Sequence, residues 1–341
     1  MTAAILVTQR APLEVATVQL PDLGVGQVLV QVKASGICGK QLDEISGRQG
    51  ADPFLPHLLG HEGAGIVVET GPGVRKVKPG DHVVLHWMKG SGMECAAPRF
   101  LRNGTTISAG WVTTFSEYTI ASENRVTSIP DDVSFDVASL LGCAATTGLG
   151  IVFNDAALRP GQSIAVFGAG GVGVNVIQGA SLVNAHPIIA IDRHDARLKQ
   201  AIAFGATHTI NASRTDPATA LSEIAGRAGV DVAVDLTGLR AVREAAYQVT
   251  SARGKTIFAG VPASNEPMTI DSFPLHFGRE ITGVHGGGTK PDADIPRYLR
   301  LFRLGKLKLA EQVTHRVRLR DINTAVAQMR QGVGCRWVIC P

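Results

Sequence analysis

One segment of the chain reads Ile164-Ala165-Val166-Phe167-Gly168-Ala169-Gly170-Gly171-Val172-Gly173, and a helix-compatible stretch follows it. A strand that runs into a G-x-G-x-x-G turn and then a helix is typical of a dinucleotide-binding fold. Gly168 permits the tight turn, Gly170 lets the backbone approach a pyrophosphate, and Gly173 lets helix and strand pack closely. We therefore predict cofactor contacts along the loop at Gly168, Gly170, Gly171 and Gly173. A glycine-rich turn in another kind of α/β protein is the alternative interpretation.

The strand that follows supports the same interpretation. It ends at Asp192, 19 residues after Gly173, which is close to the spacing of about 20 expected for an acid that binds the ribose. Its carboxylate would accept hydrogen bonds from both ribose hydroxyls and repel a 2′-phosphate, so the sequence favours NAD over NADP. Arg193 comes directly after Asp192 and would host a 2′-phosphate, which leaves NADP open.

Apolar strand-like runs alternate with helical stretches on both sides of this loop. The runs lie at residues 163–167, 188–191, 208–210, 232–235, 256–260 and 280–284. This alternation predicts a doubly wound parallel sheet of six strands in a domain over residues 146–285. A helix is expected over 137–152, just before the first strand.

The first third of the chain has a different pattern. Short β-like runs at 3–7, 28–32, 65–69 and 82–86 are separated by glycine- and proline-rich turns. A mostly β domain is therefore expected over residues 1–145. The tail after residue 285 carries helices near 295–304 and 322–331 and a strand at 336–339. It is too short for a domain of its own, so we expect residues 286–341 to complete the first domain.

Composition excludes several classes of protein. Hydrophobic residues make up 45% of the 341 residues and charged residues 18%, which rules out intrinsic disorder. The net charge is +4, but Lys and Arg are scattered, so a nucleic-acid partner is not indicated. Five cysteines form a sparse, odd set that fits a reduced cytoplasmic protein. The stretch MTAAILVTQRAPLEV has no basic segment followed by an apolar region and a cleavage site, so export is not expected. No apolar run reaches the roughly 18 residues of a membrane helix, so membrane insertion is not expected either.

Three short segments carry metal-binding chemistry: Gly36-Ile37-Cys38, Gly60-His61-Glu62-Gly63 and Gly142-Cys143. Two thiolates, an imidazole and a carboxylate form the ligand set of a catalytic zinc that keeps one position open. Each residue alone has a plainer interpretation, since a lone cysteine is most often a small core residue. Together with the dinucleotide loop, they predict a catalytic zinc site.

With these residues in view, the chain resembles the zinc-containing alcohol dehydrogenases of the medium-chain dehydrogenase/reductase superfamily. Its sequence is most similar to the branch of the glutathione-dependent formaldehyde dehydrogenases. The similarity extends over nearly the whole chain, in LGHEGAGIVVETGPGVRKVKPGDHVV, TTFSEYTIASENRV, LLGCAATTGLGIVFNDAALRPGQSIAVFGAGGVG and GVGCRWVI. It implies a GroES-like β catalytic domain beside a Rossmann domain.

The resemblance also implies roles for individual residues. For the metal they are Cys38, His61 and Cys143 as ligands, with Glu62 as a nearby ligand that exchanges with water. For the cofactor they are Thr147 and Val172 at the nicotinamide, Ala259 and Val261 near the same half, Asp192 and Arg197 at the ribose, and Arg336 at the pyrophosphate. Trp87 would form an aromatic wall of the substrate pocket, or else an ordinary core aromatic.

The sequence departs from that family in two places. Many members hold a structural zinc with four cysteines after GDHVV, but residues 87–95 contain only Cys95, so we expect one metal per chain. Lys40 stands where the family usually carries a Ser or Thr that starts a proton relay, and Asp43 stands where some relatives carry the terminal His. Lys40 either exchanges a proton with the substrate oxygen, pairs with an anionic group of the substrate, or extends its ammonium to the surface.

The sequence thus predicts a zinc-dependent oxidoreductase that moves a hydride between an alcohol or carbonyl and NAD(H). Two alternatives stay open: a reductase of activated C=C or C=N bonds in the same fold, and a protein that binds the cofactor without catalysis. Strand 280–284 and the loop over 262–273 lie where relatives pair, so a homodimer is expected, with a tetramer as the alternative.

Overall fold

The computed structural model describes all 341 residues and divides into two compact units. Unit 1 contains Met1–Thr146, Lys290–Gly305 and Leu309–Pro341, and unit 2 contains Thr147–Thr289 with Lys306–Lys308. The division expected from sequence, after residues 145 and 285, differs from the observed one by one and four residues, and Lys306–Lys308, expected in the first domain, belongs to unit 2.

Unit 1 is mostly β. Its strands are β1 (Thr2–Leu6), β2 (Glu14–Thr17), β3 (Gln27–Gly36), β4 (His57–Leu58), β5 (Glu62–Thr70), β6 (His82–His86), β7 (Phe100–Arg102), β8 (Thr105–Ile107), β9 (Tyr118–Ser122), β10 (Val126–Ser128), β17 (Val313–Arg318) and β18 (Arg336–Cys340). The main sheet has the order β10-β6-β5-β3-β18-β17, with β9 paired to β3. Strands β1, β2 and β4 form a second sheet, and β7 and β8 a hairpin.

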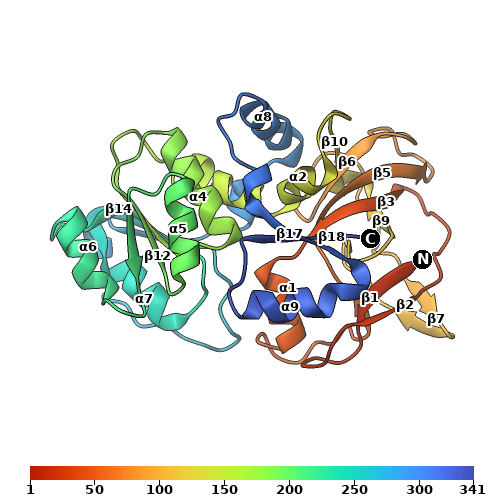
Figure 1. Ribbon diagram of the computed structural model, residues 1–341, viewed down its shortest axis with the longest axis horizontal. Helices are drawn as coiled ribbons and strands as arrows, with labels where there is room; N and C mark the ends of the chain where they lie inside the picture. Colours follow the sequence, from red (N-terminus) through yellow and green to blue (C-terminus); the bar gives the residue numbers. More distant parts are fainter. The chain divides into compact units, whose positions relative to one another are not determined.

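The core of this unit follows from the alternation of the strands. Val28, Val30 and Val32 of β3 are buried on one face and pack with Val83 and Leu85 of β6. Strand β18 pairs antiparallel with the end of β3, which brings the tail of the chain into the first sheet (Figure 1). The tail therefore completes the β unit, because β3 alone would leave an open edge there.

Four α-helices belong to unit 1: α1 (Gly39–Ser46), α2 (Phe135–Ser139), α8 (Pro291–Arg303) and α9 (Ile322–Arg330). The apolar face of α9 is buried, with Ile322, Ala325 and Val326 in one cluster with Ala4 and Leu6 of β1. The helices expected at 295–304 and 322–331 thus correspond to α8 and α9.

The prediction of a single helix over 137–152 is wrong. Helix α2 passes into the 3₁₀ turn η2 (Leu140–Gly142), the chain leaves helical geometry at Cys143 (φ −153°, ψ −71°), and α3 begins only at Ala144. Helix α3 (Ala144–Gly150) continues into a π-helical turn, η3 (Ile151–Asp155). The residues of this run are all compatible with a helix, so the break comes from tertiary packing.

Unit 2 is the doubly wound sheet that the sequence predicted. Its strands are β11 (Ile164–Phe167), β12 (Ile188–Asp192), β13 (His208–Asn211), β14 (Val230–Asp235), β15 (Thr250–Phe258) and β16 (Glu280–Gly283). All neighbours are parallel in the order β13-β12-β11-β14-β15-β16. Its longer helices are α4 (Gly171–Leu182), α5 (Asp195–Ala203), α6 (Pro217–Ala225) and α7 (Arg240–Gln248). The order reverses beside β11, which is the point where such sheets bind nucleotides.

The helices of the protein are short or interrupted compared with a membrane span. No single helix has the length and apolar composition to cross a bilayer. One pair, 135–142 and 144–155, meets both requirements only when its two parts are joined, and they are bent by 51°.

Candidate metal centre and dinucleotide loop

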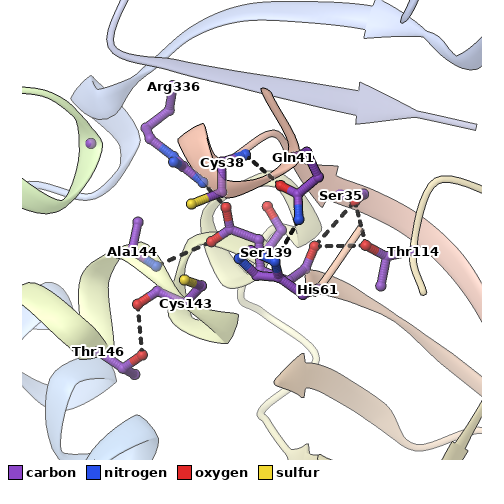
Figure 2. Close-up of polar contacts among 12 residues, drawn as sticks. Ser35, Cys38, Gln41, His61, Thr114, Ser139, Cys143, Ala144, Thr146 and Arg336 are labelled. Carbon is purple, nitrogen blue, oxygen red and sulfur yellow. Dashed lines mark hydrogen bonds and ion pairs between the residues drawn. The ribbon is translucent and has the colours of Figure 1, made fainter. Parts of the chain in front are cut away.

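Three ligand side chains converge in unit 1 from separate parts of the chain. Cys38 follows β3 and caps α1, His61 precedes β5, and Cys143 lies in the break before α3. Their potential ligand atoms all lie within 4.8 Å of one another (Figure 2). The non-helical turn at Cys143 is what brings its thiol to the other two.

The chemistry of these three groups fits a zinc ion. The Nε2 atom of His61 is buried and has no hydrogen-bond partner, so the ring presents an unused lone pair or proton to the cluster. The pKa of the Cys38 thiol is well below its ordinary value, because its contact with Cys143 and the neighbouring His61 and Arg336 side chains outweigh its burial. Thiolate and imidazole are the ligands that zinc prefers.

Glu62, the fourth predicted ligand, lies outside this cluster in the structure. Its side chain is fully buried and forms an ion pair with Arg336, and its other oxygen accepts a hydrogen bond from the Ala144 amide at 3.1 Å. A Cβ on Gly36 would lie 2.7 Å from both Arg336 Nη2 and Glu62 Oε1, so only glycine fits beside this pair. In the structure Glu62 thus lies beside the three ligands with two partners of its own, and its predicted role as a ligand that exchanges with water stays a prediction.

Arg336 has a partner inside unit 1, and its predicted role at a pyrophosphate stays a prediction. Its side chain is 3% exposed and is bonded to Glu62 inside unit 1. Burial lowers the pKa of this guanidinium, and the charge and hydrogen bond of Cys38 oppose that shift. Arg336 is therefore the cation that balances the buried carboxylate and the acidic thiol, a pairing across 274 positions that sequence reasoning missed.

Lys40 has partners of its own. It lies in the first turn of α1, where its ammonium donates to Gln49 Oε1 and lies 3.8 Å from Glu44 Oε1. About a third of the side chain is exposed. The structure thus gives Lys40 two surface-side partners, and a role in proton exchange or substrate binding stays a prediction.

Trp87 lies beside the centre. Its ring meets the His61 ring edge-on, with 6.4 Å between the centroids. The backbone oxygen of Trp87 accepts a hydrogen bond from Arg125, whose guanidinium also lies over the Trp111 ring at 4.7 Å. The position next to a metal ligand agrees with the predicted aromatic wall, and the wall itself stays a prediction.

The 87–95 loop, which lacks the four cysteines, is held by charge. Glu94 pairs with Arg125 and Lys89, each at 2.7 Å. Asp292 of α8 pairs with Lys76 at 2.5 Å and accepts the Ser91 amide at 2.6 Å. Carboxylates with matched donors therefore hold this segment in place.

The glycine loop of unit 2 has the geometry that binding a dinucleotide requires. Gly168 has φ of +100°, which a side chain would strain, and Gly170 caps α4, which starts at Gly171. A Cβ on Gly173 would lie 2.0 Å from the backbone oxygen of Gly168, so only glycine fits there. The free amides at the start of this twelve-residue helix form a ready site for a pyrophosphate.

The acid at the end of β12 supports this loop directly. Asp192 accepts the Ala169 amide at 2.9 Å and the His194 amide at 3.0 Å. Arg197 lies 3.7 Å from the same carboxylate, so the structure brings the two predicted ribose residues together. Arg193 is exposed, which leaves its predicted alternative role untested.

The remaining predicted cofactor residues also belong to unit 2. Thr147 Oγ1 is buried without a partner, as expected of a group that awaits a ligand. Ala259 and Val261 line an open pocket of about 340 Å³ beyond β15 and β16. Val172 lies in the first turn of α4, beside the glycine loop.

Comparison with known proteins gives the same family for the whole chain. Residues 24–131 match the alcohol dehydrogenase GroES-like domain, and residues 171–303 match the zinc-binding dehydrogenase domain. The chain is 34% identical to the class-3 alcohol dehydrogenase of Cereibacter sphaeroides, over 99% of this chain and 98% of that protein. It is also 34% identical to S-(hydroxymethyl)glutathione dehydrogenase of Paracoccus denitrificans, with the same coverage.

Solved structures agree with this result. An alcohol dehydrogenase zinc-binding domain protein from Burkholderia ambifaria matches with a TM-score of 0.91 and 30% identity, over 99% of this chain and 98% of that one. Benzyl alcohol dehydrogenase from Acinetobacter calcoaceticus matches with a TM-score of 0.89 and 28% identity at the same coverage. The predicted fold and family are confirmed, and the chain belongs to the zinc-dependent alcohol dehydrogenase family of oxidoreductases.

Proposed function

We propose that this zinc- and NAD-dependent family member reversibly oxidises an alcohol to its aldehyde or ketone at a zinc ion held by Cys38, His61 and Cys143. The observation that carries the proposal is the convergence of two thiols and the partnerless His61 Nε2 within 4.8 Å. Zinc bound there supplies Lewis-acid polarisation of the substrate oxygen and lowers the pKa of the alcohol.

The chain's own residues prepare that site. The acidic Cys38 thiol is ready to bind as a thiolate, and Arg336 balances its charge together with that of Glu62. In unit 2, the amides at Gly170 and Gly171 would hold the pyrophosphate, and Asp192 would accept the ribose hydroxyls. The carboxylate of Asp192, which would repel a 2′-phosphate, supports a preference for NAD over NADP.

The test is the zinc content of the purified protein together with turnover of alcohols. One zinc per chain is expected, with NAD⁺ reduction on a panel that includes benzyl alcohol and S-(hydroxymethyl)glutathione. Cys38→Ser should lose the zinc and roughly 10³-fold in activity, since Lewis-acid stabilisation contributes several kcal/mol. Cys95→Ser is the matched control, because Cys95 bonds Ser122 outside the cluster. Wild-type protein that stays free of zinc in zinc-replete medium would overturn the proposal.

We also propose that two copies pair through β16, the last strand of the six-stranded sheet. Phe273 and Phe277, in the turn that precedes β16, support this, since they are 66% and 62% exposed and contact each other with tilted rings and 5.0 Å between centroids. Light scattering should give a dimer for the wild type and a monomer for Phe273→Ser/Phe277→Ser. A monomeric wild type would overturn this assembly. The sparse, odd set of five cysteines supports a reducing, cytoplasmic location.

A further inference from the structure

Gln41 is a buried side chain that links two of the three metal-binding residues. It occupies the third position of α1 and is 1% exposed. Its Oε1 atom accepts the backbone N–H of Cys38 at 3.0 Å, and its Nε2 atom lies 2.5 Å from Nδ1 of His61 (Figure 2). One amide therefore contacts both Cys38 and His61.

The direction of these bonds follows from the chemistry of each group. A backbone N–H can only donate, so the amide oxygen must face Cys38. The NH₂ group then faces His61, and since NH₂ can only donate, Nδ1 must accept. A neutral imidazole that accepts at Nδ1 carries its proton on Nε2.

Binding a metal makes the opposite demand on the ring. Nε2 is the buried ring atom without a partner, so it is the atom that the ring offers to a metal. A metal-bound Nε2 has no proton, and Nδ1–H then needs an acceptor. With zinc bound, the Cys38 amide and His61 Nδ1 are both donors, and Gln41 has one acceptor oxygen for the two of them.

From this we infer that Gln41 is the positioning residue that sets the proton position of His61 and thereby limits the affinity of the metal site. Its amide must turn its oxygen towards Nδ1–H for Nε2 to bind, and the cap bond to Cys38 is lost in that turn. This inference rests on the proposed zinc site.

A carboxylate of the same length removes the conflict. Gln41→Glu offers one oxygen to the Cys38 amide and another to His61 Nδ1–H, so both donors are satisfied with zinc bound. Gln41→Met keeps the length but accepts from neither. Changes to such supporting residues typically alter metal affinity by about 10- to 100-fold, so we expect tighter binding for Gln41→Glu and weaker binding for Gln41→Met by factors of this size.

Gln27 provides the matched control. Its Oε1 accepts the Gly24 amide at 2.8 Å and its Nε2 donates to the Ala96 oxygen at 3.2 Å, so its amide lies between one donor and one acceptor. Gln27→Glu should leave zinc affinity unchanged. A gain in affinity from Gln41→Glu alone would thus reflect the two donors around Gln41 rather than an added negative charge.

The experiment measures zinc Kd by competition with a chromophoric chelator for the wild type and the three variants. In parallel, ¹⁵N NMR of histidine-labelled protein identifies the protonated nitrogen of His61, assigned by the signal lost in His61→Asn. We expect the proton on Nε2 without zinc and on Nδ1 with zinc in the wild type, and on Nδ1 in both states of Gln41→Glu.

Unchanged Kd in both Gln41 variants, or a wild-type ring protonated at Nδ1 before zinc is added, would overturn the inference while the zinc site stands. A wild type that binds no zinc would instead overturn the proposed function, and this inference with it. Loss of fold in Gln41→Met would leave Gln41→Glu as the deciding variant.

Discussion

The metal centre and the 87–95 loop lie in the same unit and flank neighbouring strands, but they differ in whether their polar groups have partners within the protein. At the centre, the ligand atoms of Cys38, His61 and Cys143 face one another, and His61 Nε2 has no partner. Around the loop, the carboxylates of Glu94 and of Asp292 in α8 both have a cationic partner.

This difference separates a site from a scaffold. A buried polar atom without a partner costs free energy, so it persists where a ligand supplies the partner. A satisfied ion pair needs nothing further and acts on stability alone. Ion pairs thus hold the loop where many relatives of the family carry a structural zinc. At the centre, His61 Nε2 stays without a protein partner and can bind a ligand.

The largest effect should come from the ion pair that supports the centre. Arg336→Met leaves the fully buried Glu62 carboxylate without its cation, and we expect a loss of about 3–5 kcal/mol in the free energy of unfolding. Urea unfolding followed by tryptophan fluorescence measures this in unit 1 alone, since Trp87, Trp111 and Trp337 all belong to it.

The double variant Arg336→Met/Glu62→Gln should recover part of that loss, because no buried charge is left unpaired. An Arg336→Met protein as stable as the wild type would show that this ion pair contributes nothing to the stability of unit 1.

A smaller effect is expected from His86, a buried imidazole at the end of β6 near the loop. It is 1% exposed, and burial lowers its pKa from 6.5 to about 4. Between these values the unfolded chain binds a proton that the folded chain does not. Stability should therefore be full above pH 6.5 and fall by up to about 3 kcal/mol as the pH drops to 4.

The measurement is urea unfolding at several pH values, with His86→Gln as the comparison. Nδ1 of His86 lies 2.7 Å from the Met88 oxygen, and a glutamine amide still donates to that position. The variant should lose stability less steeply below pH 6.5, and parallel curves would contradict the assignment to His86.

Much of unit 2 could be predicted from the sequence because its information is local. Each strand is a short apolar run that is buried in a parallel sheet, and each turn carries its own glycine or acid. The glycine loop and Asp192 are close in sequence, and they meet through the hydrogen bond between Asp192 and the Ala169 amide. The three metal ligands could also be predicted, since their residue types alone limit the chemistry.

The support of the centre could not be predicted, because it depends on long-range contacts. Nothing in residues 137–152 forbids a continuous helix, and the break that turns Cys143 towards the cluster appears only in the folded chain. Glu62 meets Arg336 across 274 positions, and Gln41 reaches His61 across 20. Patterns of hydrophobicity and spacing carry no information on which polar groups will face each other.

The smallest effect tests the loop itself. Hydrogen bonds from Arg125 and Lys89 lower the pKa of Glu94 from 4.5 to about 2, so its contribution is full above pH 4.5 and is lost as the pH falls towards 2. The side chain is a third exposed, and exposed pairs contribute about 0–1 kcal/mol and are screened by salt. Glu94→Gln should therefore lower the free energy of unfolding by at most about 1 kcal/mol, and by less in 1 M NaCl.

Its zinc content should equal that of the wild type, because Glu94 acts on the loop and not on the ligands. Lys89→Gln, which removes the more exposed partner of Glu94, is the matched control and should have a still smaller effect. Arg125 donates both to Glu94 and to the backbone oxygen of Trp87, which lies beside His61. If Glu94→Gln lost zinc, the change in the loop would reach the metal centre through these two residues. Loop stability and zinc binding would then be coupled through the Arg125–Trp87 hydrogen bond, and the loop could no longer be regarded as a scaffold that is independent of the metal site.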